Sequence, residues 1–135
     1  MTNQEIEKIK QDLNYDKFEI SEWAYHQCEE GNDTVQMRRL ITNSECVYWY
    51  CNYITDREEV WTKITDSEWD YYYCRDIKDR EEVWKKINDS YYAYRYCRDV
   101  KDREEVWRKI TESYDAYCYC RDVKDRPKVR RYIKR

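Results

Sequence analysis

The chain has 135 residues, 41% of them charged, 41% hydrophobic and 17% aromatic, with a formal net charge of −3. The aromatic content excludes a disordered chain, because disordered segments are poor in aromatic residues. One Gly and one Pro argue against an all-β fold, whose many turns need those residues, and favour helices.

Residues 1–20 are predicted to form an N-terminal capping helix and a linker. Thr2 and Glu5 have the spacing of a capping box, and the apolar residues Ile6, Ile9 and Leu13 follow at helical intervals. This segment lacks the apolar core of a signal peptide, and no stretch of the chain approaches the ~20 apolar residues of a membrane span. We therefore expect a cytoplasmic protein that makes no membrane contact.

Residues 21–135 form five tandem repeats of 23 residues without insertion. The predicted repeats span residues 21–43, 44–66, 67–89, 90–112 and 113–135. Five residue types recur at the same position of every repeat, and in the third repeat they are Ser67, Tyr71, Cys74, Asp79 and Ile87. Such self-similarity is typical of repeat architectures, in which each unit stacks on its neighbours.

Each repeat is predicted to contain two helices. The first is expected to begin at the recurring Ser as N-cap, and the second at the recurring Asp, with Glu three residues later as in Asp79–Glu82. Two such starts leave about nine to ten residues for each helix, a length that is marginal in isolation. The predicted fold class is therefore all-α, an α-solenoid of five helix-turn-helix repeats with an N-terminal capping helix.

Helical periodicity assigns the buried faces. In the fourth repeat the buried face is predicted to contain the following side chains: Ala93, Tyr94, Tyr96, Cys97, Val100, Val106, Trp107 and Ile110. In the last repeat Arg130 replaces the Trp found at Trp61, Trp84 and Trp107. A charged residue at that position suits an outer, capping face.

The spacing of the seven cysteines predicts neither disulfides nor a metal site. Equivalent residues of stacked helices lie about 9–10 Å apart, whereas a disulfide needs Cα atoms within about 7 Å. A zinc site usually needs a CxxC motif or paired His, and neither is present. We expect the recurring Cys to be small buried residues, Cys46 and Cys118 to lie off that column, and Cys118 to be exposed and reactive. No cofactor or metal is predicted.

Arginine and tryptophan are spaced four residues apart in Arg57–Trp61, Arg80–Trp84 and Arg103–Trp107. The guanidinium can lie over the indole, and the pair is expected to act as a clamp between repeats. The alternative is a row that binds bases or phosphates. A basic surface for nucleic acid or an acidic partner would use the following residues: Arg80, Arg103, Lys128, Arg130 and Arg131. The interleaved Asp residues of the Arg-Asp and Lys-Asp-Arg runs weaken such a surface and favour a charge ladder between repeats.

Two columns of the first helices vary between repeats and are expected to be exposed. They comprise Trp23, Cys46, Trp69, Tyr92 and Asp115, and His26, Trp49, Tyr72, Arg95 and Cys118. Tyr, Trp and Arg dominate interface hot spots, so the predicted partner-binding residues are Trp23, Trp49, Trp69, Tyr72, Tyr92 and Arg95. The alternative is that these side chains simply cover the groove between helices.

No enzyme is predicted. The chain has no Gly-rich phosphate loop and no plausible Ser–His or Cys–His arrangement. Its single His, His26, is expected to be a surface residue. Acidic residues are abundant, but they are expected at helix caps or paired with Lys and Arg.

The repeat resembles the short Tyr/Trp-rich helical repeats of uncharacterised bacteriophage and large DNA virus proteins. Those repeats often read W-A-Y-x-Y-A-R-D-V-I-K, and residues 90–103 read SYYAYRYCRDVKDR. The resemblance covers residues 21–135, with Cys where such repeats usually have Ala. It implies a viral origin and the host cytoplasm as location, but no activity.

These patterns lead to a hypothesis of function. We expect a non-catalytic module that binds a protein partner and is a monomer or a weak oligomer. In a phage it would inhibit a host enzyme or a defence complex. The alternatives are a protein that binds single-stranded nucleic acid by stacking and a purely structural, self-associating array.

Overall fold

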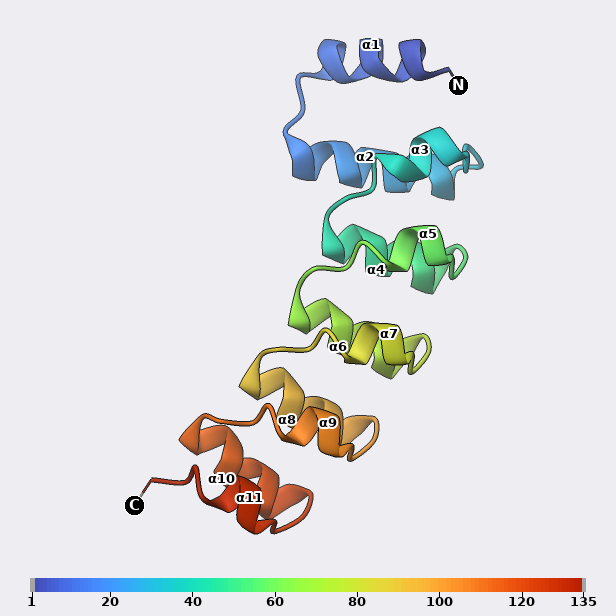
Figure 1. Cartoon of the computed structure of the whole chain (residues 1–135). Coiled ribbons are helices and arrows are strands. Elements are labelled where there is room, and N and C mark those ends of the chain that lie inside the picture. The colour runs from blue at the N-terminus through green and yellow to red at the C-terminus, as the bar shows by residue number, and fades with distance from the viewer. Residues whose placement is uncertain (1, 135) are drawn as a thin grey trace. The chain divides into compact units, whose positions relative to one another are not determined.

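The computed structural model describes residues 2–134, and this part of the chain is all-helical (Figure 1). The helices, in chain order, are α1 (Asn3–Leu13), α2 (Lys17–Glu29), α3 (Val35–Arg39), α4 (Ser44–Tyr53), α5 (Glu58–Trp61), α6 (Ser67–Asp76), α7 (Glu81–Trp84), α8 (Ser90–Asp99), α9 (Glu104–Trp107), α10 (Ser113–Asp122) and α11 (Pro127–Arg130). Among residues 2–134, none of the helices combines the length and the apolar character that crossing a membrane requires.

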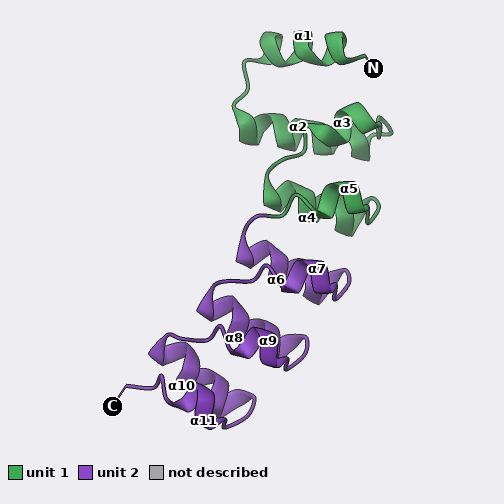
Figure 2. Ribbon diagram, in the orientation of Figure 1, with its two compact units in different colours: residues 1–64 green, residues 65–135 purple. Residues whose placement is uncertain are grey.

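The chain divides into two compact units, residues 1–64 and residues 65–135 (Figure 2). In the first unit α2 packs on α3 and α4, and α4 packs on α5. In the second unit α6, α8 and α10 pack in succession, and each also packs on the short helix that follows it. Repeated helix pairs that pack in succession are the arrangement of a helical solenoid, as the sequence predicted.

The N-terminal helix forms as predicted, but the linker after it is shorter than expected. Thr2 Oγ1 accepts a hydrogen bond from the Glu5 backbone N–H at 3.1 Å, and Ile6 is buried. Helix α2 then begins at Lys17, four residues before the predicted start at Ser21. Asp16 and Glu19 form a complete capping box at this point, so the stronger start signal determines where the helix begins.

The recurring Ser does not cap the first helix, so this prediction was wrong. Ser90 is the first residue of α8, and Asp89 is the N-cap, whose side chain accepts from the Tyr92 N–H at 3.0 Å. Ser90 Oγ instead accepts from the backbone N–H groups of Thr111 and Glu112, each at 3.1 Å. Ser21 makes the same pair of bonds with residues 42 and 43. The hydroxyl thus anchors the linker that leads into the next repeat.

The recurring Asp does not cap the second helix either, and that helix is shorter than predicted. The N-caps of α7 and α9 are Arg80 and Arg103, and neither makes a side-chain cap hydrogen bond. Each of these helices has 4 residues. Backbone hydrogen bonds of the i→i−3 type tighten the chain after each helix, and the Ile110 N–H, for example, donates to Trp107 O at 3.1 Å. The predicted buried face of the second helix is nevertheless confirmed, because Val106, Trp107 and Ile110 are all buried. Of the residues predicted to be buried in the first helix of that repeat, Val100 is only half-buried.

The Asp column joins consecutive repeats. Asp79 accepts from the Tyr96 hydroxyl at 2.6 Å and from Arg103 Nη2 at 2.9 Å, both in the following repeat. Asp102 accepts in the same way from Tyr119 and Arg126. Burial and the hydrogen bond to Asp79 raise the pKa of Tyr96 well above its ordinary value, so the hydroxyl remains a donor. A charged ladder between repeats was expected, and the Asp column provides one.

Arginine and tryptophan form a clamp between repeats, as predicted, but the stacked partners come from consecutive repeats and are not the i,i+4 pairs. The Arg103 guanidinium lies 4.8 Å from the ring centre of Trp84, in the preceding repeat, and Arg126 lies 5.1 Å from that of Trp107. The extended backbone at each Arg carries its side chain back toward the earlier repeat, where it also reaches the Asp column. The clamp therefore holds two repeats together.

Candidate functional site

The variable columns of the first helices are less exposed than the sequence indicated. Cys46, Asp115 and Cys118 are buried, which corrects the expectation that both columns lie on the surface. Cys118 was expected to be exposed and reactive, but only 4% of it is exposed. Helix α10, which carries Asp115 and Cys118, packs on α8 and α11. Neighbouring helices can cover positions that a single helix would present to solvent, and sequence periodicity within one repeat does not reveal those neighbours.

The predicted partner-binding residues are half-buried and lie in both units. In the first unit Trp23 lines a cleft beside Glu19 and His26, and the Trp49 ring lies 5.6 Å from that of Tyr25. His26 is exposed, as expected. In the second unit the structure brings four of the predicted residues, Trp69, Tyr72, Tyr92 and Arg95, onto one face of α6 and α8.

Ring contacts join the aromatic residues on that face of the second unit, in part through Tyr71, which is buried. The Trp69 and Tyr72 rings are 5.1 Å apart, and Tyr71 bridges Tyr72 at 5.2 Å and Tyr92 at 5.9 Å. Tyr92 in turn lies 5.1 Å from Tyr91. Tilted and edge contacts at these separations are favourable for aromatic pairs, so the rings hold one another in place.

Three tyrosines of α8 and α10 in the same unit are exposed, and sequence analysis missed them as candidates. Tyr91 is 43% exposed, Tyr114 72% and Tyr117 47%. The signal for two of them was present in the sequence, because their column reads Glu22, Glu45, Glu68, Tyr91 and Tyr114. A change from Glu to Tyr at an exposed position increases the apolar surface. We call Trp69, Tyr72, Tyr91, Tyr92, Arg95, Tyr114 and Tyr117 the aromatic face.

The arginines around the aromatic face are paired with aspartates. Arg98 binds both carboxylate oxygens of Asp99, at 2.7 and 3.0 Å, and Arg121 binds both oxygens of Asp122, at 2.6 and 2.9 Å. The Arg121 hydrogen bonds and the Tyr94 hydroxyl hold the pKa of Asp122 below its ordinary value. These pairs leave little unbalanced positive charge on this surface.

Arginine side chains also cover part of the ring surface. Arg95 lies 4.9 Å from the ring centre of Tyr71 and 5.7 Å from that of Tyr91, and Arg121 lies 5.3 Å from that of Tyr117. Cation–π contacts of this kind fix a long side chain at a defined position. The aromatic face is thus preorganised, which lowers the entropy lost when a partner binds.

The basic residues predicted for nucleic acid do not form one surface. Arg103 donates to Asp79 and Tyr96, and Arg80 donates to the Tyr73 hydroxyl at 2.6 Å. Arg130 donates to Asp125. Lys128 and Arg131, by contrast, line the same cleft near α11. The structure therefore brings together two of the five residues.

The thiols and carboxylates of the described residues do not form a metal centre. In residues 2–134, which include all seven cysteines, there is no disulfide, and no three His, Cys, Asp or Glu side chains come together to hold an ion. Burial raises the pKa of the Cys74 and Cys97 thiols to about 12. Four members of the Cys column, Cys28, Cys51, Cys74 and Cys97, are buried as predicted, whereas Cys120 is half-exposed.

Comparison of the chain with protein-family models, with curated protein sequences and with solved structures gives no match.

Proposed function

We propose that the chain is a non-catalytic module that binds a protein partner, and that the aromatic face of the second unit is the contact surface. One observation carries this proposal. Large rings remain exposed at Tyr91, Tyr114 and Tyr117, while the neighbouring Arg98 and Arg121 are neutralised by bidentate Asp partners.

The charge balance favours a protein over a nucleic acid. A strand of DNA or RNA is held by unpaired Lys and Arg that replace its counterions, and here each such arginine would first have to leave its aspartate. A folded protein of near-neutral surface can instead bury the tyrosine rings and accept hydrogen bonds from their hydroxyl groups. If a phage encodes the chain, the proposed partner is a host enzyme or a defence complex.

The test compares two variants in capture from a lysate of the source cells, with and without nuclease. The triple variant Tyr91→Ala, Tyr114→Ala, Tyr117→Ala removes the exposed rings. The control Tyr53→Ala removes an equally exposed ring, 68% exposed, from the first unit. We expect one protein to be captured by the wild type and by the control, in the presence of nuclease, and to be lost with the triple variant.

Three results would contradict the proposal. Equal capture by the triple variant would exclude the aromatic face. Capture that disappears on nuclease treatment, together with binding to single-stranded oligonucleotides that falls steeply with salt, would instead support the nucleic-acid alternative. Loss of a self-associated species on triple substitution, measured by light scattering, would show that the face joins copies of this chain.

A further inference from the structure

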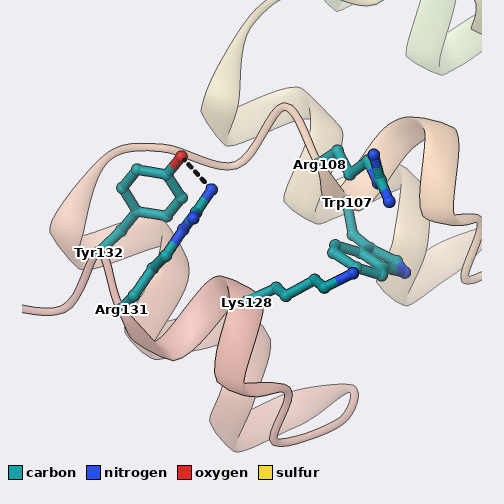
Figure 3. Close-up of a pocket in the computed structure, with 5 residues that line it drawn as sticks. All are labelled: Trp107, Arg108, Lys128, Arg131 and Tyr132. Carbon is teal, nitrogen blue, oxygen red and sulfur yellow. Dashed lines mark hydrogen bonds between the residues drawn. The ribbon is translucent and has the colours of Figure 1, made fainter.

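A basic cleft lies between α9 and α11, and none of its lining residues belongs to the aromatic face. Its volume is about 420 Å³, and it is lined by Trp107, Arg108, Lys128, Arg131 and Tyr132. Figure 3 shows Trp107 and Arg108 on one side of the hollow and Arg131 with Tyr132 on the other, with the Lys128 ammonium extended toward the Trp107 ring. Three cations and two aromatic rings line the cleft, and no carboxylate is among its lining residues.

Two substitutions in the last repeat create this composition. Lys128 occupies the column that holds Glu59, Glu82 and Glu105 in the preceding repeats. The reversal replaces a negative side chain by a positive one next to Arg108 and Arg131. Since the chain as a whole has a net charge of −3, the basic character of this cleft is a local feature of the last repeat.

The second substitution replaces a structural lysine. Tyr132 occupies the column of Lys63 and Lys109, and those two lysines donate to carbonyl groups of the preceding repeat. Lys109 Nζ, for example, lies 2.8 Å from Lys85 O and 2.5 Å from Ile87 O. A tyrosine cannot bring an ammonium group to that place, and its ring lies at the edge of the cleft instead.

Two of the three cations, Arg131 and Arg108, make only weak interactions with other groups. Arg131 donates to the Tyr132 hydroxyl at 3.0 Å and lies 4.9 Å from the centre of that ring, so its interactions are with a neutral partner. Arg108 lies 3.4 Å from Glu104 in an ion pair whose two side chains are more than half exposed, and such pairs are weak. The nearby Asp125 is occupied by Arg130.

We propose that this cleft binds the phosphate group of a small phosphorylated molecule. Arg108, Lys128 and Arg131 supply the donors, since guanidinium and ammonium groups form strong charge-assisted hydrogen bonds to phosphate oxygens. The cleft is larger than one phosphate group, and Trp107 and Tyr132 provide apolar walls for an attached organic group. This site is independent of the proposed protein-binding face, so either proposal can fail without the other.

The test is an NMR titration of the full chain with inorganic phosphate, pyrophosphate and adenosine monophosphate, with sodium chloride keeping the ionic strength constant. We expect saturable shifts of the backbone amides of residues 107, 108, 128, 131 and 132 with at least one phosphate probe. Tighter binding of the nucleotide than of inorganic phosphate would show that the aromatic walls contribute to affinity.

Three variants distinguish a site from general attraction of anions. Lys128→Glu restores the residue of the other repeats, and Arg131→Gln removes a second cation. Each is expected to weaken binding about tenfold or more, the effect of losing one charge-assisted hydrogen bond. The control Lys101→Gln removes an exposed cation of the same unit and should leave the affinity within about twofold.

The proposal would be overturned by any of three results. These are shifts that do not saturate at millimolar probe, shifts that chloride reproduces, and an affinity that is unchanged in Lys128→Glu. Circular dichroism of each variant confirms that the helices are retained. Because glutamate already occupies the equivalent position of three repeats, we expect Lys128→Glu to fold.

Discussion

The Asp125 carboxylate accepts two hydrogen bonds from Arg130 Nη1, each 2.9 Å long, within one repeat. Arg130 occupies the column position of Trp107. In the repeat before it, Asp102 accepts instead from Tyr119 and Arg126 of the next repeat, and Trp107 lies under that same Arg126. The exchange of Trp for Arg thus gives Asp125 a local partner where Asp102 uses a neighbouring repeat.

This difference predicts unequal effects for two matched substitutions. Asp102→Asn weakens contacts that join two repeats, and we expect a loss of roughly 2–3 kcal/mol in the free energy of unfolding, the magnitude of hydrogen bonds to charged groups. Asp125→Asn affects an exposed pair, 49% and 59% exposed, and should cost less than about 1 kcal/mol. Urea denaturation of both variants measures the difference, and equal losses would show that the Asp column does not couple repeats.

Ser90 should act on the next linker and not on its own helix. In Ser90→Ala the amides of Thr111 and Glu112 lose their acceptor, so we expect them to exchange hydrogen faster and the protein to lose about 1 kcal/mol of stability. The amide of Tyr92, which Asp89 caps, should keep its protection. Asp89→Ala provides the reciprocal control. Faster exchange at Tyr92 in Ser90→Ala would restore the original N-cap hypothesis.

Asp70 should make stability depend on pH. It is 1% exposed in a column that holds Ala93 and Ala116 in the next two repeats, and burial raises its pKa from 3.8 to about 7, against the attraction of Lys86 at 3.5 Å. The folded state therefore retains a proton that the unfolded chain releases, so this group's contribution to stability falls as pH rises from about 4 to 7 and is constant above that range.

Substitution of this residue gives the corresponding measurement. Each pKa unit corresponds to ~1.4 kcal/mol, so Asp70→Asn should be more stable than the wild type by an amount that grows with pH to the order of 2–4 kcal/mol at pH 8. Thermal or urea unfolding from pH 4 to 8 follows this difference. Glu82→Gln, at an exposed position of the same unit, is the control. A difference between Asp70→Asn and the wild type that stays constant with pH would exclude a raised pKa for Asp70.

Thiol reactivity should follow burial, so Cys120 is expected to react before Cys118. Cys120 is half-exposed, whereas 4% of Cys118 is exposed. Burial also raises the pKa of Cys120, which makes its reaction slow for a surface thiol. We expect Cys118 to be slower still, by an order of magnitude or more, because the reagent cannot reach it without local unfolding. Timed labelling of the native protein at pH 8 and peptide mapping distinguish the two residues, and faster labelling of Cys118 would contradict its burial.

The repeat length, the all-helical class and the buried faces were predictable from sequence alone. Residues that recur every 23 positions meet the same environment in every repeat, and apolar residues at helical spacing must face a common side. Tyr96 and Val106 are buried for this reason. Pro127 likewise stands in the first turn of α11, as its missing N–H requires.

The tertiary structure alone determined which repeat supplies each partner. A Ser, an Asp or an Arg is equally compatible with a contact inside its own repeat. The sequence predicted local helix caps for the Ser and Asp columns. It also predicted a charge ladder and an Arg–Trp clamp between repeats, but not which residues of the two repeats are partners. In the folded chain Ser90 meets the next linker, Asp79 meets Tyr96, and Arg103 meets Trp84. Cys118 is likewise buried in the folded chain, although the periodicity of its own helix indicated an exposed position. The physical reason is that spacing along the chain defines positions within one repeat, while burial and polar partners depend on how closely a second repeat approaches it.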